Sequence, residues 1–427
     1  MGLASLKRTI LLVSYYAPPS GSTGARRPGH LSHFMTEQGH EVITITSSAS
    51  FSGNIGVSCP PTTLPSRDLM MSGLNWRRDQ LDAVANASPT ATYRANPSRI
   101  ASLFVPDPQS ISWVPFAVRE IRRIASKRTI DCIVTTSPPQ STHLTALLTK
   151  HLNIPWVADF RDGWNFERLA PPSSLRVIAA TDRAVESRVM RNADAIVAVT
   201  KPIADDIERR FSRHATVITN GFDPKEQRSG SMATENGMHE RSVVYTGTIG
   251  AGARQQHLPP LLAGMAIANS ELGTGFTNRL TFAGPLTPTE QQMIAESQPL
   301  AHHAGILGRD ETLKLQRNAD VLVVLIGDDK PGVATGKIFE YLAAGRPILV
   351  VGERNVAAMI VEQTGTGIAT ATTPQAIAAG LVKLLRGDAY APNLEAINAY
   401  SWPVLARRFE DVIETAIEGH DQQRGQR

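Results

Sequence analysis

Short apolar runs rich in β-branched residues alternate with stretches whose apolar positions recur at helical spacing. In the first half, strands are predicted at 10–14, 42–46, 131–135, 156–159, 195–199 and 216–219. Helices are predicted between them at 25–38, 115–127, 142–152 and 175–191. This alternation is typical of βαβ units, which build a parallel sheet.

The segment 47–108 interrupts the alternation because it is rich in Pro, Ser and Asn. Long segments of this composition are usually functional loops. We therefore predict an excursion over the active face of the protein, with one short helix near 75–84.

A polar stretch at 225–241 predicts a linker, and a second alternating series follows it. Its strands are predicted at 242–245, 280–282, 304–307, 321–326, 348–351 and 367–369. Its helices are predicted at 258–269, 287–296, 310–318, 335–344 and 374–385. A last amphipathic helix is expected at 400–418, and residues 421–427 are expected to fray.

These patterns predict an α/β fold with two Rossmann-like, doubly wound parallel-sheet domains that face each other across a cleft. The N-terminal domain is expected at 1–224, the linker at 225–241 and the C-terminal domain at 242–399. Residues 400–427 are expected to pack back on the N-terminal domain. Because doubly wound sheets bind ligands at the carboxyl ends of their strands, the substrate is expected between the two domains.

The composition fits this fold and excludes several classes of function. Of 427 residues, 42% are apolar and 19% are charged, which suits a globular protein with two cores. The net charge of +4 is spread over the whole chain, so it does not indicate a nucleic-acid-binding protein. Only two cysteines are present, which excludes a disulfide scaffold and a cysteine-based zinc site. No apolar stretch approaches the roughly 20 residues of a membrane span, so we expect a cytoplasmic protein.

Two glycine-containing loops each follow the first strand of a predicted domain. The loop at 17–24 contains Gly21 and Gly24 and leads into a helix, whose free N–H groups could bind an anion. A flexible connection is the alternative interpretation, since no G-x-G-x-x-G motif is present. The second domain repeats this arrangement with Gly247 and Thr248, and Arg254 lies within reach of a phosphate.

The segment 159–164 ends a predicted strand with two carboxylates and a guanidinium, from Asp159, Asp162 and Arg161. Such a group could orient a sugar hydroxyl, and one carboxylate could accept its proton. The alternative is a salt-bridged strand end without a chemical role. The histidines form no convincing metal-ligand cluster.

The segment 332–347 contains a glycine loop that opens a helix, with Thr335, Gly336 and Lys337 at its start. A lysine beside the free N–H groups of a helix start suits a diphosphate. Glu340 lies three residues on, about 4.5 Å further along the helix and on nearly the same face. It could accept hydrogen bonds from the ribose hydroxyls of a nucleotide, whereas the alternative is a surface Lys/Glu pair.

Taken in order, several segments resemble the GT-B nucleotide-sugar glycosyltransferases, specifically the retaining, glycosyltransferase family 4-like (group 1) branch. The resemblance extends from about residue 10 to residue 417. It rests on Tyr15-Tyr16-Ala17-Pro18-Pro19, Gly39-His40-Glu41-Val42, Ser137-Pro138-Pro139, 159–164, Asn220-Gly221-Phe222-Asp223, Tyr245-Thr246-Gly247-Thr248 and 335–347.

The resemblance implies transfer of a sugar, as in hexosyltransferases, from a nucleotide-diphosphate sugar to an acceptor hydroxyl with retention. Such reactions build polysaccharides, glycolipids and glycoconjugates, and the branch needs no metal or other cofactor. Glu340 matches the ribose-binding glutamate of the family's E-x7-E motif, whereas the first glutamate of that motif falls at Gly332. Gln255 and Gln256 stand where the family often has a lysine beside Arg254, and Lys337 is expected to supply that charge.

The expected donor site therefore comprises Gly247, Thr248, Arg254, Gly308, Thr335, Gly336, Lys337 and Glu340. Asp162 and Arg161 are the expected catalytic residues, and Gly21 and Gly24 the expected acceptor or phosphate contacts. The proton of the acceptor hydroxyl could go to Asp162 or to the leaving phosphate. A nucleotide-sugar epimerase of the same fold and an inactive nucleotide-binding scaffold remain alternatives.

The predicted helix at 115–127 carries Arg119, Arg122 and Arg123 on one face. In the simpler interpretation this is the solvated side of a core helix. In the other, it contacts anionic lipid headgroups and brings the enzyme to a lipid-linked acceptor at the inner face of the plasma membrane.

Overall fold

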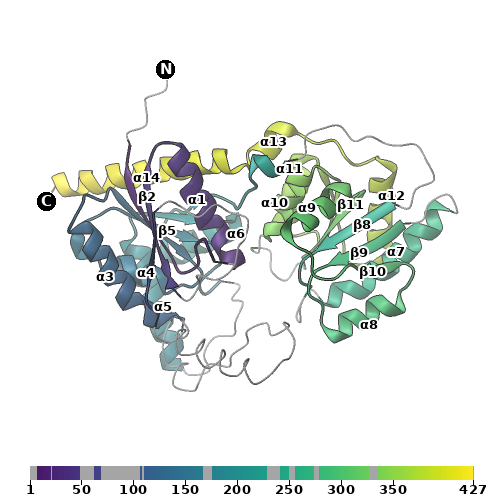
Figure 1. Cartoon of the computed structure of the whole chain (residues 1–427), viewed down its shortest axis with the longest axis horizontal. Coiled ribbons are helices and arrows are strands. Elements are labelled where there is room, and N and C mark those ends of the chain that lie inside the picture. Colours follow the sequence, from purple (N-terminus) through teal and green to yellow (C-terminus); the bar gives the residue numbers. More distant parts are fainter. Residues whose placement is uncertain are drawn as a thin grey trace. The chain divides into compact units, whose positions relative to one another are not determined.

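The computed structural model describes residues 7–20, 22–48, 62–68, 106–107, 110–166, 176–227, 241–249, 255–273, 278–326, 332 and 335–426. The chain forms two compact units. Unit 1 comprises Met1–Thr219 and Leu405–Arg427, and unit 2 comprises Asn220–Val404. Figure 1 labels most of the helices and some of the strands of both units.

Unit 1 contains a seven-stranded parallel sheet with the strand order β3-β2-β1-β4-β5-β6-β7. Its strands are β1 (Thr9–Ser14), β2 (Glu41–Ser47), β3 (Thr63–Ser66), β4 (Cys132–Ser137), β5 (Trp156–Phe160), β6 (Ala195–Ala198) and β7 (Thr216–Val217). The strand order reverses between β1 and β4, where Leu12 lies beside both Thr44 and Val134. Doubly wound sheets hold their ligands at such a reversal, next to the carboxyl ends of the strands.

Helices cover both faces of this sheet (Figure 1). They are α1 (Arg26–Glu37), α3 (Val114–Ala125), α4 (Thr142–Leu147), α5 (Arg176–Asn192), α6 (Lys201–Phe211) and α14 (Trp402–Gly425). One core joins Leu11 and Val13 of β1 to buried residues of α3, α4, α5 and α6. Helix α14 is tied to the start of β1, because Arg8 donates from Nε and Nη2 to the two carboxylate oxygens of Glu414, at 2.8 and 2.5 Å.

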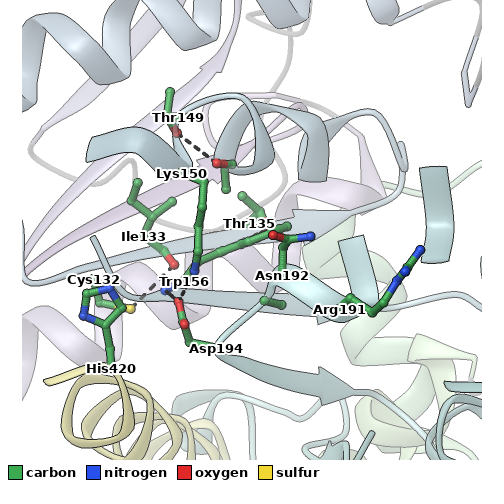
Figure 2. Close-up of polar contacts among 12 residues, drawn as sticks. Cys132, Ile133, Thr135, Thr149, Lys150, Trp156, Arg191, Asn192, Asp194 and His420 are labelled. Atoms are coloured by element: carbon green, nitrogen blue, oxygen red, sulfur yellow. Dashed lines mark hydrogen bonds and ion pairs between the residues drawn. The ribbon is translucent and has the colours of Figure 1, made fainter. Parts of the chain in front are cut away.

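At the amino-terminal edge of the same sheet, Asp194 fixes the start of β5 (Figure 2). Its Oδ2 accepts hydrogen bonds from the backbone N–H of Trp156 and from Lys150 Nζ, both at 2.8 Å. The indole Nε1 of Trp156 donates to Thr135 Oγ1 on β4, also at 2.8 Å. These donors and acceptors are paired with one another within the protein, so we assign them a structural role.

Unit 2 contains a six-stranded parallel sheet with the strand order β10-β9-β8-β11-β12-β13. Its strands are β8 (Arg241–Thr246), β9 (Asn278–Ala283), β10 (Ala301–His303), β11 (Val321–Leu325), β12 (Ile348–Val351) and β13 (Gly367–Thr370). Its helices are α7 (Leu258–Leu272), α8 (Pro288–Glu296), α9 (Arg309–Asn318), α10 (Gly336–Ala344), α11 (Val356–Thr364), α12 (Pro374–Arg386) and α13 (Leu394–Asn398). Two separate cores lie on the two faces of the sheet, one with α7 and α12 and the other with α10 and α11. Unit 2 is therefore a second doubly wound α/β layer structure.

The two parallel sheets confirm the predicted fold class. The predicted strand at 304–307 is wrong, because β10 occupies Ala301–His303 and Gly305 then adopts a positive φ of 81° that interrupts extended backbone. The C-terminal tail is not frayed at 421, because α14 continues to Gly425. The prediction also missed α6, α11, α13 and the short strand β3, which includes a proline at the edge of the sheet. The helix predicted near 75–84 lies outside the described residues.

Candidate functional site

A buried ion pair lies at the carboxyl end of β5 in unit 1. Asp159 accepts hydrogen bonds from Nε and Nη2 of Arg27, at 2.9 and 2.8 Å, and from Thr136 Oγ1 at 2.6 Å. The two charged side chains are 0% and 2% exposed, and Arg27 also donates to the carbonyl of Thr219. The alternative of a salt-bridged strand end therefore applies to Asp159.

Arg161 joins three loops at the point where the strand order reverses. Its guanidinium donates to the carbonyls of Ser137, the last residue of β4, at 2.5 Å and of Pro138 at 2.9 Å, and to the carbonyl of Gly24 after β1. Burial lowers the pKa of Arg161 to about 10, so the group still carries its charge at neutral pH. Gly24, an expected ligand contact, thus uses its carbonyl within the protein, whereas Gly21 lies outside the described residues.

Asp162 follows on the same loop and is partly exposed. Its carboxylate makes no hydrogen bond or ion pair with the residues that the structure describes. Burial raises the pKa of Asp162 above its usual range, although the positive charge of Arg161 opposes this shift. A carboxylate with a raised pKa is a stronger base than an ordinary one and can accept a proton from a hydroxyl.

Two residues of α5 hold the loop that carries Asp162. Trp164 Nε1 donates to Asp182 at 2.9 Å, and Asn165 Nδ2 donates to Glu186 at 2.6 Å. Glu186 is itself buried and paired by both Nη groups of Arg210, at 2.9 and 2.6 Å. The loop is thus anchored just after Gly163, while the Asp162 carboxylate stays unpaired within the described residues.

In unit 2, Lys337 lies in the first turn of α10, after the N-cap residue Thr335, whose hydroxyl accepts from the backbone N–H of Lys337. The ammonium donates to the hydroxyl of Tyr245 at 2.6 Å and to the carbonyl of Thr248 at 3.4 Å. The carboxyl end of β8 and the start of α10 are thereby brought together.

Two glycines make this close approach sterically feasible. Gly247 has a φ of 93°, and a Cβ there would lie 2.7 Å from Cε of Lys337. Gly284, after β9, has a φ of 138°, and a Cβ there would lie 2.7 Å from the carbonyl oxygen of Gly247. A larger residue at either position would push the loop and the lysine apart.

Glu340 lies on the next turn of α10, where its carboxylate contacts Arg309 Nη1 at 3.5 Å and Gln316 Nε2 at 3.3 Å. Arg309 also pairs with Glu226. Burial lowers the pKa of Arg309, but the two carboxylates outweigh this effect and raise it overall. Of the other expected donor residues, Gly308 and Gly336 are exposed at the starts of α9 and α10, and Arg254 lies outside the described residues.

No contact role was predicted from the sequence for the residues that hold these groups: Tyr245, Arg309, Gln316, Asp182 and Glu186. Each contacts its partner from another element, so no local spacing in the sequence indicates the pair. Within the described ranges, no group of three or more His, Cys, Asp or Glu could hold a metal ion. No helix in the part of the chain that the structure covers is both long and apolar enough to cross a membrane.

Comparison with solved structures shows the same fold over nearly the whole chain. A sucrose-phosphate synthase from Thermosynechococcus elongatus has a TM-score of 0.65 at 16% identity, covering 96% of this chain and 98% of that one. An Anabaena protein in complex with UDP and glucose has a TM-score of 0.58 at 12% identity, covering 96% and 100%. A putative UDP-N-acetylglucosamine 2-epimerase from Listeria monocytogenes has a TM-score of 0.56 at 14% identity, covering 97% of each chain. These likenesses show the GT-B fold.

Comparison of the sequence finds a likeness to a family over part of the chain. No curated protein matches the chain. Residues 25–226, which include Arg27, Asp159, Arg161 and Asp162, match Glycosyltransferase Family 4. Over these residues, just under half of the chain, the protein is similar to that family.

Proposed function

We propose that this protein transfers a sugar from a nucleotide-diphosphate sugar to an acceptor hydroxyl, with retention of the anomeric configuration. The reaction is of the hexosyltransferase kind and serves polysaccharide, glycolipid or glycoconjugate biosynthesis. The observation that carries the proposal is the position of Lys337 at the start of α10, against the glycine loop after β8, with Glu340 one turn further on.

The C-terminal domain, 242–399, would hold the nucleotide. Lys337, Arg254 and the N–H groups at the starts of α9 and α10 would stabilise the diphosphate as it leaves. Glu340 would accept hydrogen bonds from the ribose hydroxyls, and the remaining expected contacts are Gly247, Thr248, Gly308, Thr335 and Gly336. This arrangement supplies positive charge from the chain itself, so we expect no metal or other cofactor.

The N-terminal domain, 1–224, would hold the acceptor beside the loop at 17–24. Asp162 would orient the attacking hydroxyl and accept its proton, unless a leaving phosphate oxygen takes it. Arg161 would keep the loops after β1, β4 and β5 in register, since three backbone carbonyls of these loops accept its hydrogen bonds. We further propose that 225–241 links the domains and that 400–427 returns to the first of them.

We also propose that the enzyme works in the cytoplasm and meets a lipid-linked acceptor at an anionic membrane surface. Arg119 and Arg122 of α3 are exposed, whereas Arg123 pairs with Glu120. The apolar side of α3 lies in the core of unit 1, so the contact would be electrostatic only. Attachment through two or three arginines would be weak and reversible.

A panel of sugar nucleotides, incubated with and without acceptor lipids, tests the proposal by measuring the release of free nucleoside diphosphate. We expect release that depends on the acceptor and that a chelator leaves unchanged. Conversion of the sugar nucleotide into an isomer without an acceptor would instead show an epimerase. Binding of nucleotide without turnover under any condition would show an inactive scaffold.

A further inference from the structure

Tyr245 lies at the carboxyl end of β8, with its ring buried against Phe282 and its hydroxyl at the edge of the sheet. The hydroxyl accepts a hydrogen bond from Lys337 Nζ at 2.6 Å and donates one to the carbonyl of Thr248 at 2.9 Å. Because the ring is fixed by packing, the phenol oxygen is a rigid point on which the ammonium is held.

The two oxygens that hold the ammonium, from Tyr245 and Thr248, are neutral. These two contacts fix the position of the ammonium and bring no negative charge of their own. A lysine side chain is flexible and loses conformational entropy when it binds an anion. Placing it in advance reduces that loss, so an anion at this position binds more tightly.

The backbone beneath the lysine is shaped for the same placement. The carbon atom next to the ammonium, Cε, lies so close to Gly247 that a Cβ there would come within 2.7 Å. The ammonium also lies 4.1 Å from the centre of the Tyr245 ring. Gly247 and the Tyr245 ring, both at the carboxyl end of β8, therefore constrain the same lysine side chain.

We propose that Tyr245 is a positioning residue that holds Lys337 ready for the diphosphate of the donor. This inference rests on the proposed function of unit 2. It predicts that the Tyr245 hydroxyl contributes to recognition of the phosphates and not to recognition of the base or ribose.

The test is the substitution Tyr245→Phe, which keeps the buried ring and removes only the hydroxyl. Wild type and variant are titrated with UDP, GDP and ADP and with the matching monophosphates. For the diphosphate that wild type binds, we expect affinity to fall about tenfold, as for loss of one hydrogen bond to a charged group. In a Lys337→Met background, Tyr245→Phe should change the affinity no further, because the residue acts through the lysine.

Tyr341→Phe is the matched control. Tyr341 is also fully buried, and its hydroxyl lies 3.0 Å from the backbone N–H of Thr246, one residue from Tyr245. A purely structural effect of losing a buried hydroxyl would weaken diphosphate and monophosphate binding equally in both variants. We expect a selective loss of diphosphate affinity in Tyr245→Phe alone.

A second measurement reports on the lysine without any nucleotide. Acylation of Lys337, followed by mass spectrometry with the exposed Lys383 as internal reference, should be faster in Tyr245→Phe because the ammonium loses an acceptor that stabilises its charged form.

Unchanged diphosphate affinity, or equal losses in both backgrounds, would overturn the inference and leave the proposed function standing. If wild type binds none of these nucleotides, the proposed function fails and the inference fails with it.

Discussion

Charged side chains at the carboxyl ends of the two sheets have different kinds of partner. In unit 1, the cations Arg27 and Arg161 are engaged by a buried carboxylate and by backbone carbonyls, while Asp162 has no ion-pair partner among the residues placed by the structure. In unit 2, Lys337 donates hydrogen bonds to the Tyr245 hydroxyl and the Thr248 carbonyl, while the carboxylate of Glu340 contacts a guanidinium.

Under the proposed function, this difference would suit the two units to two kinds of ligand. A carboxylate without an ion-pair partner suits a hydroxyl, which needs a hydrogen-bond and proton acceptor. A positioned ammonium beside a helix start suits an anion such as a diphosphate. In both units the fold provides a carboxyl end of a parallel sheet where a ligand could bind. The partners of the charged side chains there decide which kind of ligand suits it.

The largest expected effect concerns the carboxylate of Asp162 in unit 1. Asp162→Asn keeps the shape and removes the charge, so turnover should fall about 100- to 10,000-fold, the range for loss of a general base. Donor binding in unit 2 should stay within about twofold of wild type. Steady-state kinetics and a nucleotide titration measure the two quantities, and full turnover in the variant would assign the proton to the leaving phosphate.

The raised pKa of Asp162 gives the same experiment a pH dependence. In the pH profile of kcat/KM, the pKa of the acidic limb should lie above that of an ordinary aspartate, about 3.9. The reason is that activity needs the ionised form of Asp162. Between the unfolded and folded pKa values, the folded protein binds more protons than the unfolded chain, so this group's contribution to stability falls as the pH rises. Asp162→Asn should therefore melt no earlier than wild type at neutral pH.

The neighbouring aspartate should behave in the opposite way. Asp159→Asn leaves the buried guanidinium of Arg27 without its counter-charge, which typically costs about 3–5 kcal/mol. For a unit of this size, the melting temperature should fall by roughly 6–20 °C. A thermal melt of both Asp→Asn variants compares them directly, and equal melting temperatures would contradict the distinction between a structural and a free carboxylate.

The carboxylate of unit 2 is tested by Glu340→Ala. Loss of an acceptor for two ribose hydroxyls is worth on the order of 2–3 kcal/mol. Nucleoside-diphosphate affinity should therefore fall roughly 30- to 150-fold at an unchanged melting temperature. Calorimetric titration of ribo- and 2′-deoxyribonucleotides measures this, and a variant with wild-type affinity would remove Glu340 from the nucleotide site.

The smallest effect extends the comparison to the surfaces of the two units. Arg119→Gln/Arg122→Gln in α3 should weaken co-sedimentation with anionic vesicles, since each arginine near such a surface contributes about 1 kcal/mol. Lys383→Gln/Arg386→Gln in α12 changes the net charge equally and should have no effect. Binding should also disappear as salt is raised. If wild type ignores anionic vesicles at low salt, a soluble acceptor becomes the better hypothesis.

The fold and part of the candidate site could be predicted because their signals are local. Strand β12 was placed residue for residue, since its four buried apolar residues lie between the glycine end of α10 and a polar loop. Lys337 and Glu340 could be placed on one helix because helical spacing relates positions three apart. Strand β10 was misplaced because its polar residues, His302 and His303, lack the apolar signal of a buried strand.

Partners that come from distant parts of the chain could not be predicted. Tyr245 and Lys337 are 92 residues apart, and Arg309 reaches Glu226 and Glu340 from a third segment. Which residues meet at a sheet edge depends on the order and register of the strands, and no single stretch of sequence contains that information.

The sequence by itself determined the two α/β series, the glycine loops after their first strands, and the residue types at each strand end. Only the tertiary structure decided that Asp159 is neutralised by Arg27 while Asp162, three residues on, makes no ion pair with any residue described. The reason is physical: alternation and helical spacing follow from local backbone geometry, whereas the state of a charge depends on what lies within a few ångströms in space, and that is set by the packing of the whole unit.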